Sequence, residues 1–372
     1  MSELITKFKN QILILLSLIA LISFIDSVKK GFFNSCDFQW QPAKLFWDGI
    51  NHYSKFLTNG KYDFLCQGGE YGHLLNIIYY PFTLFEWEVA RVLWLIVNCF
   101  FVILIPLLIC KKFSLSKYKT IVLFLIFITC HPTRVTINYG QQSLLVMFFL
   151  ILPFIFKSNL SILSSGISSV KYSSGYILFL NFLSKKEYKK FLIATVPYLI
   201  GWLIYFSYTK SDPLVNFFEP IIWSLQQEYV RQVIDIYTLG EKYFLNNETI
   251  YKYLYILLIF IINFIILIKI NKLSNNFLKL SLILICPLIF FPHSIYDYIL
   301  LFPLACYSLL NFKILINKFN FYYVVYIFFF HRIIKHILDI DWLYQPLLLL
   351  SLITVLFLNI RLNINKEDKL LE

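Results

Sequence analysis

The stretch NSCDFQWQPAKLFWDG, residues 34–49, follows the first long apolar run and opens the long polar segment in the N-terminal half of the chain. It places an acid, Asp37, about ten residues beyond the end of that run. An aspartate before an aromatic run is often only a helix N-cap, here of a short helix that we expect to begin near Pro42. The alternative is a reactive carboxylate at a membrane surface, and the rest of the chain bears on that choice.

The composition predicts an all-α polytopic membrane protein. Of the 372 residues, 59% are hydrophobic and only 15% are charged, whereas soluble domains contain roughly 45–50% apolar and 25% charged residues. Apolar runs near the length of a bilayer-spanning helix recur along the whole chain, and no linker divides it. We therefore expect residues 1–372 to form a single domain. The net charge of +12 comes from Lys and Arg in short loops, which indicates membrane topology and does not favour binding of nucleic acid.

The charge pattern predicts about twelve transmembrane or half-membrane segments with both termini in the cytoplasm. Residues 10–27 form the first span, which we interpret as a membrane anchor that is retained and not as a cleaved signal peptide. Residues 28–87 form a first external loop with one or two interfacial helices, and residues 209–248 form a second external loop. Cys36 and Cys66 share the first loop and fit either one disulfide or two thiols. The remaining predicted segments are 88–110, 119–131, 142–156, 159–184, 190–208, 249–268, 280–292, 298–311, 319–334 and 342–360.

Two predicted segments are irregular. The runs 119–131 and 142–156 flank a short turn over residues 131–142, and both are short for a full span, so we expect a tilted or broken helix there. The run 159–184 is interrupted by a Ser-rich stretch around Lys171. A pair of short segments with Lys171 at their outer turn avoids placing an ammonium group at mid-membrane, which would be costly.

Polar side chains suited to chemistry collect at the predicted outer face. Lys171 either snorkels to the interface or binds a lipid phosphate as a point charge. Arg134 either anchors the interface or clamps a phosphate, and His293 is either structural or part of a binding group with Tyr296 and Asp297. An acid beside several cations fits sugar transfer from a lipid phosphate, in which Asp37 takes the acceptor proton and the cations stabilise the departing phosphate.

Several short motifs between residues 10 and 310 occur in the same order as in a known family. Two of them are the Gly-Gln turn before an apolar run and the later segment that contains His293. The chain resembles glycosyltransferase family 87, membrane mannosyltransferases of the GT-C type that use polyprenyl-phosphate sugars. It departs from the family pattern at Phe82, where a second proline is expected, and at residues 172–174, which replace prolines after the lysine. The motifs are Asp37-Phe38, residues 43–49, Tyr79-Tyr80-Pro81, Gly140-Gln141, Lys171 and residues 293–298.

The resemblance implies a GT-C-like fold and an inverting hexosyltransferase with Asp37 as general base. The implied donor is a polyprenyl-phosphate sugar, with mannose as a candidate hexose, and the implied acceptor is an external lipid or glycan. No cofactor is implied. No metal is assigned either, because Cys36 stands where some other GT-C families have a second acid. The membrane would be a bacterial inner membrane, with the site on its extracytoplasmic side. Donor phosphate binding is assigned to Lys171, Arg134 and His293, and sugar or acceptor contacts to Gln141, Tyr296, Asp297 and Asp48.

Two other functions share some of these features. A transporter or flippase of lipid-linked glycans would need charged residues through the membrane depth and often an internal repeat. Here the polar groups gather at one predicted face and no repeat is visible, which favours the enzyme. A glycan polymerase or ligase would use the same lipid-phosphate chemistry on the same face and stays open.

Overall fold

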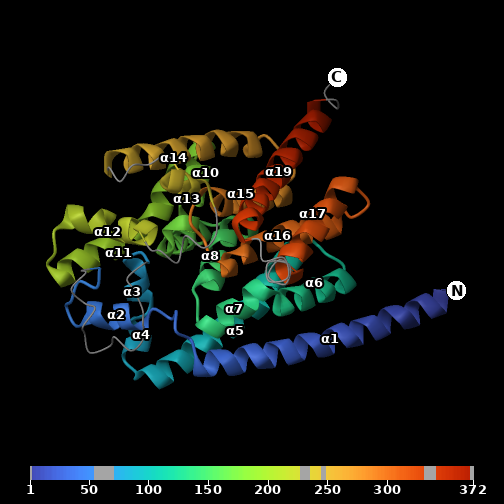
Figure 1. Ribbon diagram of the computed structural model, residues 1–372, viewed down its shortest axis with the longest axis horizontal. Coiled ribbons are helices and arrows are strands. Elements are labelled where there is room, and N and C mark those ends of the chain that lie inside the picture. Colours follow the sequence, from blue (N-terminus) through green and yellow to red (C-terminus); the bar gives the residue numbers. More distant parts are fainter. Residues whose placement is uncertain (1, 54–70, 227–234, 244–248, 331–340, 369–372) are drawn as a thin grey trace.

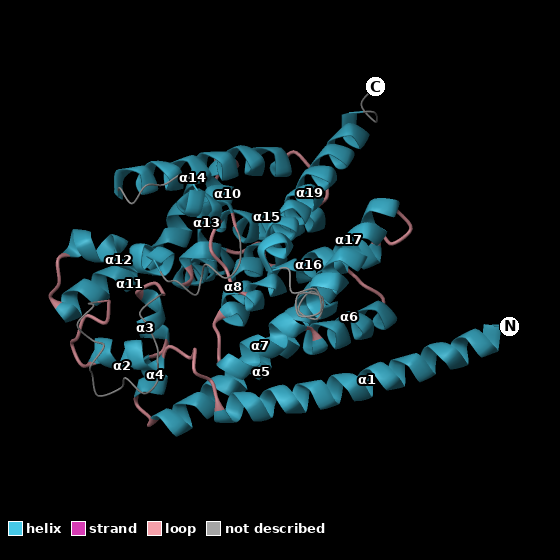
Figure 2. Ribbon diagram, viewed as in Figure 1, coloured by secondary structure: helices cyan, strands magenta, loops and turns pink. Residues whose placement is uncertain are grey.

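The computed structural model describes residues 2–53, 71–226, 235–243, 249–330 and 341–368 (Figure 1). It is all-helical, with no strand among the described residues (Figure 2), which confirms the all-α part of the predicted fold class and does not test the GT-C-like arrangement. In the part of the chain that the structure describes, four helical segments are long and apolar enough to cross a membrane. They are α5 (Trp87–Lys112), α11 (Tyr188–Thr209), Tyr253–Asn271 of α14 (Thr249–Asn271) and Pro346–Asn363 of α19 (Asp341–Asp368).

The predicted number of about twelve segments is not confirmed. A fifth span arises if α6 (Lys117–Thr129) and α7 (His131–Tyr139) are taken together across their 50° bend. The other apolar helices are shorter than the roughly 20 residues that a bilayer crossing requires. The short turn expected over residues 131–142 is wrong for most of its length, because residues 131–139 form α7 and the turn covers only residues 140–142, with Gly140 at φ +69°.

The first helix, α1 (Ser2–Phe33), is longer than the predicted span 10–27 and runs along one edge of the molecule (Figure 1). It packs against α7, α6 and α5. Gly31 sets the closest approach, since a Cβ there would lie 2.6 Å from the backbone oxygen of Ile137. A side chain at this position would push α1 away from α7.

The described part of the segment predicted as the first external loop folds into short helices beside the end of α1. The helix expected near Pro42 is α2 (Trp40–Trp47), followed after a gap by α3 (Leu74–Ile78) and α4 (Tyr80–Thr83). Phe38 is fully buried and stacks on Trp94 of α5, with 5.4 Å between the ring centroids. These ring contacts fix the backbone on either side of Asp37. Cys66 lies outside the described residues, so its pairing stays untested.

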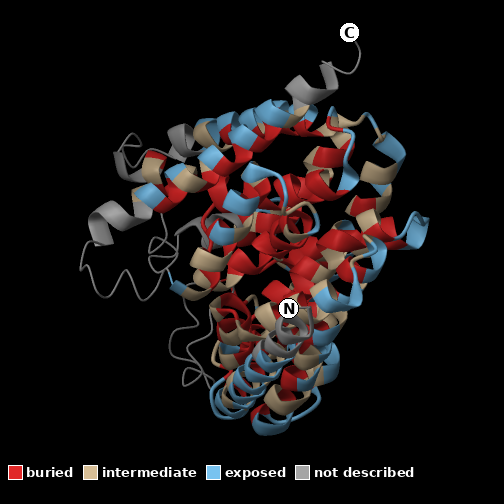
Figure 3. Cartoon of the chain, turned by 90° about the vertical axis from the view of Figure 1, so that its right-hand side faces the viewer, coloured by how far each residue is buried: buried red, intermediate tan, exposed pale blue. Residues whose placement is uncertain are grey.

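The chain breaks at Lys171 as predicted, between η3 (Gly166–Val170) and α10 (Tyr172–Ser184). Buried residues fill the centre of the molecule (Figure 3), where α15 (Asn276–Phe290) is buried along its apolar length. A helix that is apolar all round needs neighbours on every side, and here they include α8, α10, α14 and α16. The remaining described elements are α8 (Ser143–Ile155), α9 (Asn159–Ser165), α12 (Pro213–Gln226), α13 (Ile236–Tyr243), η5 (Ile295–Leu301), α16 (Phe302–Leu310), α17 (Leu315–Val325) and η6 (Tyr326–Phe330).

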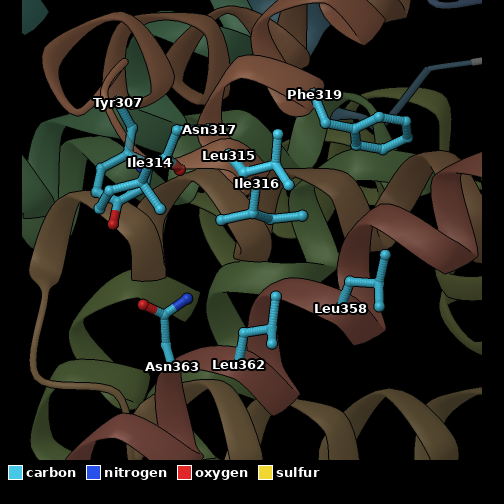
Figure 4. A pocket seen from close by; sticks show the side chains of 9 residues that line it. All are labelled: Tyr307, Ile314, Leu315, Ile316, Asn317, Phe319, Leu358, Leu362 and Asn363. Atoms are coloured by element: carbon cyan, nitrogen blue, oxygen red, sulfur yellow. The ribbon is translucent and has the colours of Figure 1, made fainter.

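An apolar cavity of about 560 Å³ lies between the end of α16, α17 and α19 (Figure 4). The side chains of Leu315, Leu358 and Leu362 line it, and Asn317 and Asn363 are its polar members. It carries no acid or cation, so it does not offer the chemistry expected of the transfer site.

Candidate active site

A buried ion pair joins α10 to η5. Lys171 Nζ lies 2.6 Å and 2.7 Å from the two carboxylate oxygens of Asp297. The same carboxylate accepts hydrogen bonds from the Ser143 hydroxyl at 2.7 Å and from the backbone N–H of Ser294 at 3.0 Å. The two charged side chains are only 11% and 4% exposed. Asp297 is therefore saturated with donors, as a buried carboxylate must be to stay charged.

Local sequence explains why these groups meet. Ser294 and Asp297 form a capping box at the start of η5, which orients the carboxylate. Lys171 has an extended backbone between η3 and α10. Gly175 lets α10 pack closely on η3, because a Cβ there would lie 2.4 Å from the backbone oxygen of Ser168. The lysine is thus held by the tight turn between its two helices.

Asp37 lies near this pair. Its backbone N–H donates to the carbonyl of Tyr139 at 2.8 Å, and its carbonyl accepts from the Gln142 amide at 3.1 Å. Burial raises the pKa of the Asp37 carboxyl, while a hydrogen bond from Gln141 and the charge of Lys171 act to lower it. The structure therefore brings the acid, Gln141 and Lys171 together from three separate segments of the chain.

Gln141 is buried and held on both sides. Its Oε1 accepts a hydrogen bond from the Tyr71 hydroxyl at 2.7 Å, which leaves the NH₂ group for the Asp37 carboxylate. Gly140 precedes it in the left-handed conformation that favours glycine. The Gly140 carbonyl accepts a hydrogen bond from the Trp94 indole at 2.7 Å. The Gly-Gln turn is thus locked by Trp94 on one side and Tyr71 on the other.

His293 offers an unused acceptor. Its ring is 4% exposed, and Nδ1 lies 3.2 Å from the carbonyl of Phe291. A carbonyl only accepts, so Nδ1 carries the proton and Nε2 has the lone pair. Nε2 is buried and has no hydrogen-bond partner among the described residues. Burial lowers the pKa of His293 to about 4, so the ring is neutral near pH 7. A cationic role in phosphate binding, expected from the sequence, does not fit a neutral ring.

Tyr296 also joins this group, because its ring lies under the Lys171 ammonium at 4.6 Å. The structure thus gathers Asp37, Gln141, Lys171 and Asp297 with His293 and Tyr296.

Two predicted site residues make other contacts. The Arg134 guanidinium donates to Asp26 of α1 at 3.0 Å and to the Ser27 hydroxyl at 3.4 Å. Asp48 is 45% exposed, and its described ion pair is with Lys44, at 3.9 Å. Neither residue has a described contact with the Lys171–Asp297 pair.

Sequence reasoning missed Ser143, Tyr71 and Asp26. Ser143 begins α8 directly after the Gly-Gln turn, a position that usually indicates helix capping rather than a polar network. Tyr71 gave no signal among the many tyrosines of the chain. Asp26 did give one, because an acid at the end of an apolar run needs a cationic partner, and Arg134 supplies it.

The model of Glycosyltransferase family 87 matches residues 71–292, which is more than half of the chain. No curated protein and no solved structure matches it. The matched range contains Arg134, Gln141 and Lys171, whereas Asp37 and Asp297 lie outside it.

Proposed function

This chain belongs to glycosyltransferase family 87, and we propose that it transfers a hexose, with mannose the first candidate, from a polyprenyl phosphate to an acceptor hydroxyl with inversion. The proximity of an acid, Asp37, to a buried cation, Lys171, whose charge acts to lower the pKa of that acid, is the observation that carries this proposal. The acceptor is an external lipid or glycan, and the enzyme lies in a bacterial inner membrane with this site on the extracytoplasmic side.

Asp37 is the general base. Its carboxylate takes the proton of the acceptor hydroxyl as that oxygen forms a bond to the anomeric carbon, and the bond from this carbon to the phosphate oxygen breaks. A base is most effective when its pKa lies near the working pH, and burial moves the Asp37 pKa upward in that direction. Gln141 orients the carboxylate, and Tyr71 orients Gln141.

Lys171 stabilises the departing phosphate. An ammonium group has three N–H donors, and the carboxylate of Asp297 receives two of the described contacts. The third donor has a longer contact, 3.4 Å to the Ser143 hydroxyl, and it turns to the phosphate oxygen, where charge grows as the bond breaks. Asp297 then positions Lys171, a role that replaces the sugar contact expected from the sequence.

His293 contacts the sugar. A neutral imidazole with a buried, unused Nε2 lone pair is suited to accept a hydrogen bond from a hydroxyl group. Leaving that acceptor unpaired costs about 1–3 kcal/mol, and a bound sugar would recover it. The ring of Tyr296, beside Lys171, closes the same side of the site.

Replacement of the base tests the proposal. Membranes with the wild-type chain or Asp37→Asn receive polyprenyl-phosphate mannose or glucose, and mass spectrometry follows sugar addition to lipids and glycans. The amide cannot take a proton, so we expect transfer to fall by about 10²–10⁴-fold. The control is Glu86→Gln, which changes an exposed carboxylate of the same external segment.

Transfer by Asp37→Asn at the wild-type rate would contradict the role of Asp37. Addition of a whole glycan, rather than one hexose, would indicate a ligase. Movement of unchanged donor across the membrane, without transfer, would indicate a flippase.

A further inference from the structure

A cavity of about 680 Å³ lies where the C-terminal end of α1 meets α7. It does not include Lys171 or Asp297. Residues from both helices and from the chain just beyond them line it, namely Asp26, Lys29, Lys30, Phe33, Asn34, His131, Arg134, Val135, Asn138 and Tyr139.

The cavity carries an excess of positive charge. Lys29, Lys30 and Arg134 face one carboxylate, Asp26. Asp26 Oδ2 is shared, at 2.8 Å from Lys30 Nζ and 3.0 Å from Arg134 Nη2. Lys29 is exposed and makes no ion pair or hydrogen bond within the described chain. One carboxylate cannot balance three cations, so the cavity is complementary to an added anion.

An apolar stripe on α1 leads directly to this cavity. Exposed Ile14, Leu18, Ile22 and Ile25 follow one another at intervals of three or four residues, which places them on one helix face. The same spacing continues to Lys29 and Phe33, which line the cavity. Figure 3 shows exposed residues along this helix below the end marked N. A ligand that fills the cavity therefore has an apolar surface beside it.

We propose that this cavity binds the phosphate of an acidic lipid, with the acyl chains of that lipid lying along the exposed stripe of α1. A phosphate head group matches the cationic lining, and hydrocarbon matches the isoleucines and leucine on the same face. A soluble phosphate would use only the first of these features. The site goes beyond sugar transfer and gives Arg134 a role apart from the donor.

The cavity also shares its wall with the loop that carries Asp37. The carbonyl of Asn138 accepts from the backbone N–H of Ser35 at 3.2 Å, and that of Tyr139 accepts from the backbone N–H of Asp37 at 2.8 Å. Asn138 and Tyr139 line the cavity. A lipid bound here therefore contacts the two residues that hold the backbone of Ser35 and Asp37 in place.

The test measures lipid retention and needs no sugar transfer. The full chain is placed in nanodiscs of phosphatidylcholine mixed with phosphatidylglycerol, and native mass spectrometry compares the lipids that it retains. Lys29→Gln combined with Lys30→Gln is expected to reduce the preference for phosphatidylglycerol on the order of tenfold. Asp26 keeps its pair with Arg134 in this variant, and thermal unfolding in neutral detergent confirms the fold.

Lys44→Gln combined with Lys210→Gln is the matched control, because it removes the same charge from two positions that do not line the cavity. An equal loss in this control would overturn the proposal, as would an unchanged preference in the Lys29 and Lys30 variant. Displacement of the lipid by glycerol phosphate would assign the cavity to soluble phosphates instead. A raised KM for the polyprenyl donor with lipid retention intact would assign it to the donor. Because retention is measured directly, failure of the proposed transfer reaction leaves this result readable.

Discussion

The Asp37 carboxyl is subject to opposing effects at the scale of single residues. Burial raises its pKa, and the hydrogen bond from Gln141 and the charge of Lys171 act against that rise. Because its pKa is raised, the Asp37 carboxylate becomes protonated at a higher pH than an exposed aspartate does. The protonated carboxyl group can no longer accept the proton of the acceptor hydroxyl. The rate of transfer should therefore fall on the acidic side, through the pKa of Asp37.

Removal of the Gln141 side-chain amide tests whether the Asp37 pKa sets the pH dependence of transfer. In Gln141→Leu the hydrogen bond that lowers the Asp37 pKa is gone, so the pKa rises and the acidic limb of the pH–rate profile moves to higher pH. Tyr71→Phe should shift it in the same direction by less, because Gln141 keeps its amide but loses its anchor. The measurement is transfer rate against pH. Asn311→Leu, at the end of α16, is the control and should leave the limb in place.

A double-mutant cycle tests the buried pair of Lys171 and Asp297. Lys171→Gln leaves the Asp297 carboxylate buried without its cation, and we expect a loss of about 3–5 kcal/mol in unfolding free energy. Combining it with Asp297→Asn removes both charges and should restore most of the lost unfolding free energy. Sugar transfer should not be restored, because no cation is left to stabilise the departing phosphate. Thermal unfolding and transfer assays report the two effects separately. Recovery of transfer in the double variant would contradict the phosphate role of Lys171.

At the scale of elements, broken helices present the reactive groups. The break at Lys171 separates η3 from α10, and the turn at Gly140 separates α7 from α8. Each break frees backbone groups and side chains that a continuous helix would direct elsewhere. Such breaks at membrane depth are tolerated only where they are buried in protein or line a cavity.

Close packing of α10 on η3 should therefore control the position of Lys171. In Gly175→Ala the new Cβ meets the Ser168 backbone oxygen at 2.4 Å, so η3 and α10 must separate. We expect lower stability and a raised KM for the donor, because the Lys171 ammonium moves from its place. Ser173→Ala, two residues away on α10, is the control. Donor kinetics that match the wild type in Gly175→Ala would show that the turn does not position the lysine.

At the scale of the whole molecule, segments distant in sequence meet at one place. The end of α1, the α7–α8 turn, the start of α10 and the start of η5 supply the candidate site together. The sequence places these four points on one predicted face, and their contacts in the structure agree with that placement. Within the described residues four helical segments, or five with the bent α6–α7 pair, are long and apolar enough to cross a membrane, and the expected number of about twelve transmembrane or half-membrane segments is not confirmed.

Reporter fusions test the topology. Lys186 follows α10 and Asp212 follows α11, so the two positions lie at opposite ends of one candidate span. A fusion at Lys186 should report the cytoplasm and one at Asp212 the outside, in accord with the lysines around residue 186. Both reporters on the same side would contradict a membrane crossing by α11.

The helical class, the membrane character and the break at Lys171 follow from the sequence alone, whereas the turn expected over residues 131–142 is helical up to Tyr139. Apolar run length, charge clusters and interruptions by glycine or serine are local properties, because each determines the backbone structure at its own position in the chain. The sequence also drew attention to Asp37, Gln141, Lys171 and His293, but could not show that they meet.

Which side chains pair with one another depends on the tertiary structure. It paired Lys171 with Asp297 and Arg134 with Asp26, and it buried His293 deeply enough to make it neutral. These outcomes depend on close helix packing, such as that of Gly31 against Ile137, and on ring stacking around Phe38. Packing of this kind joins residues that are far apart in the chain, and hydropathy and charge patterns do not encode which of them will touch.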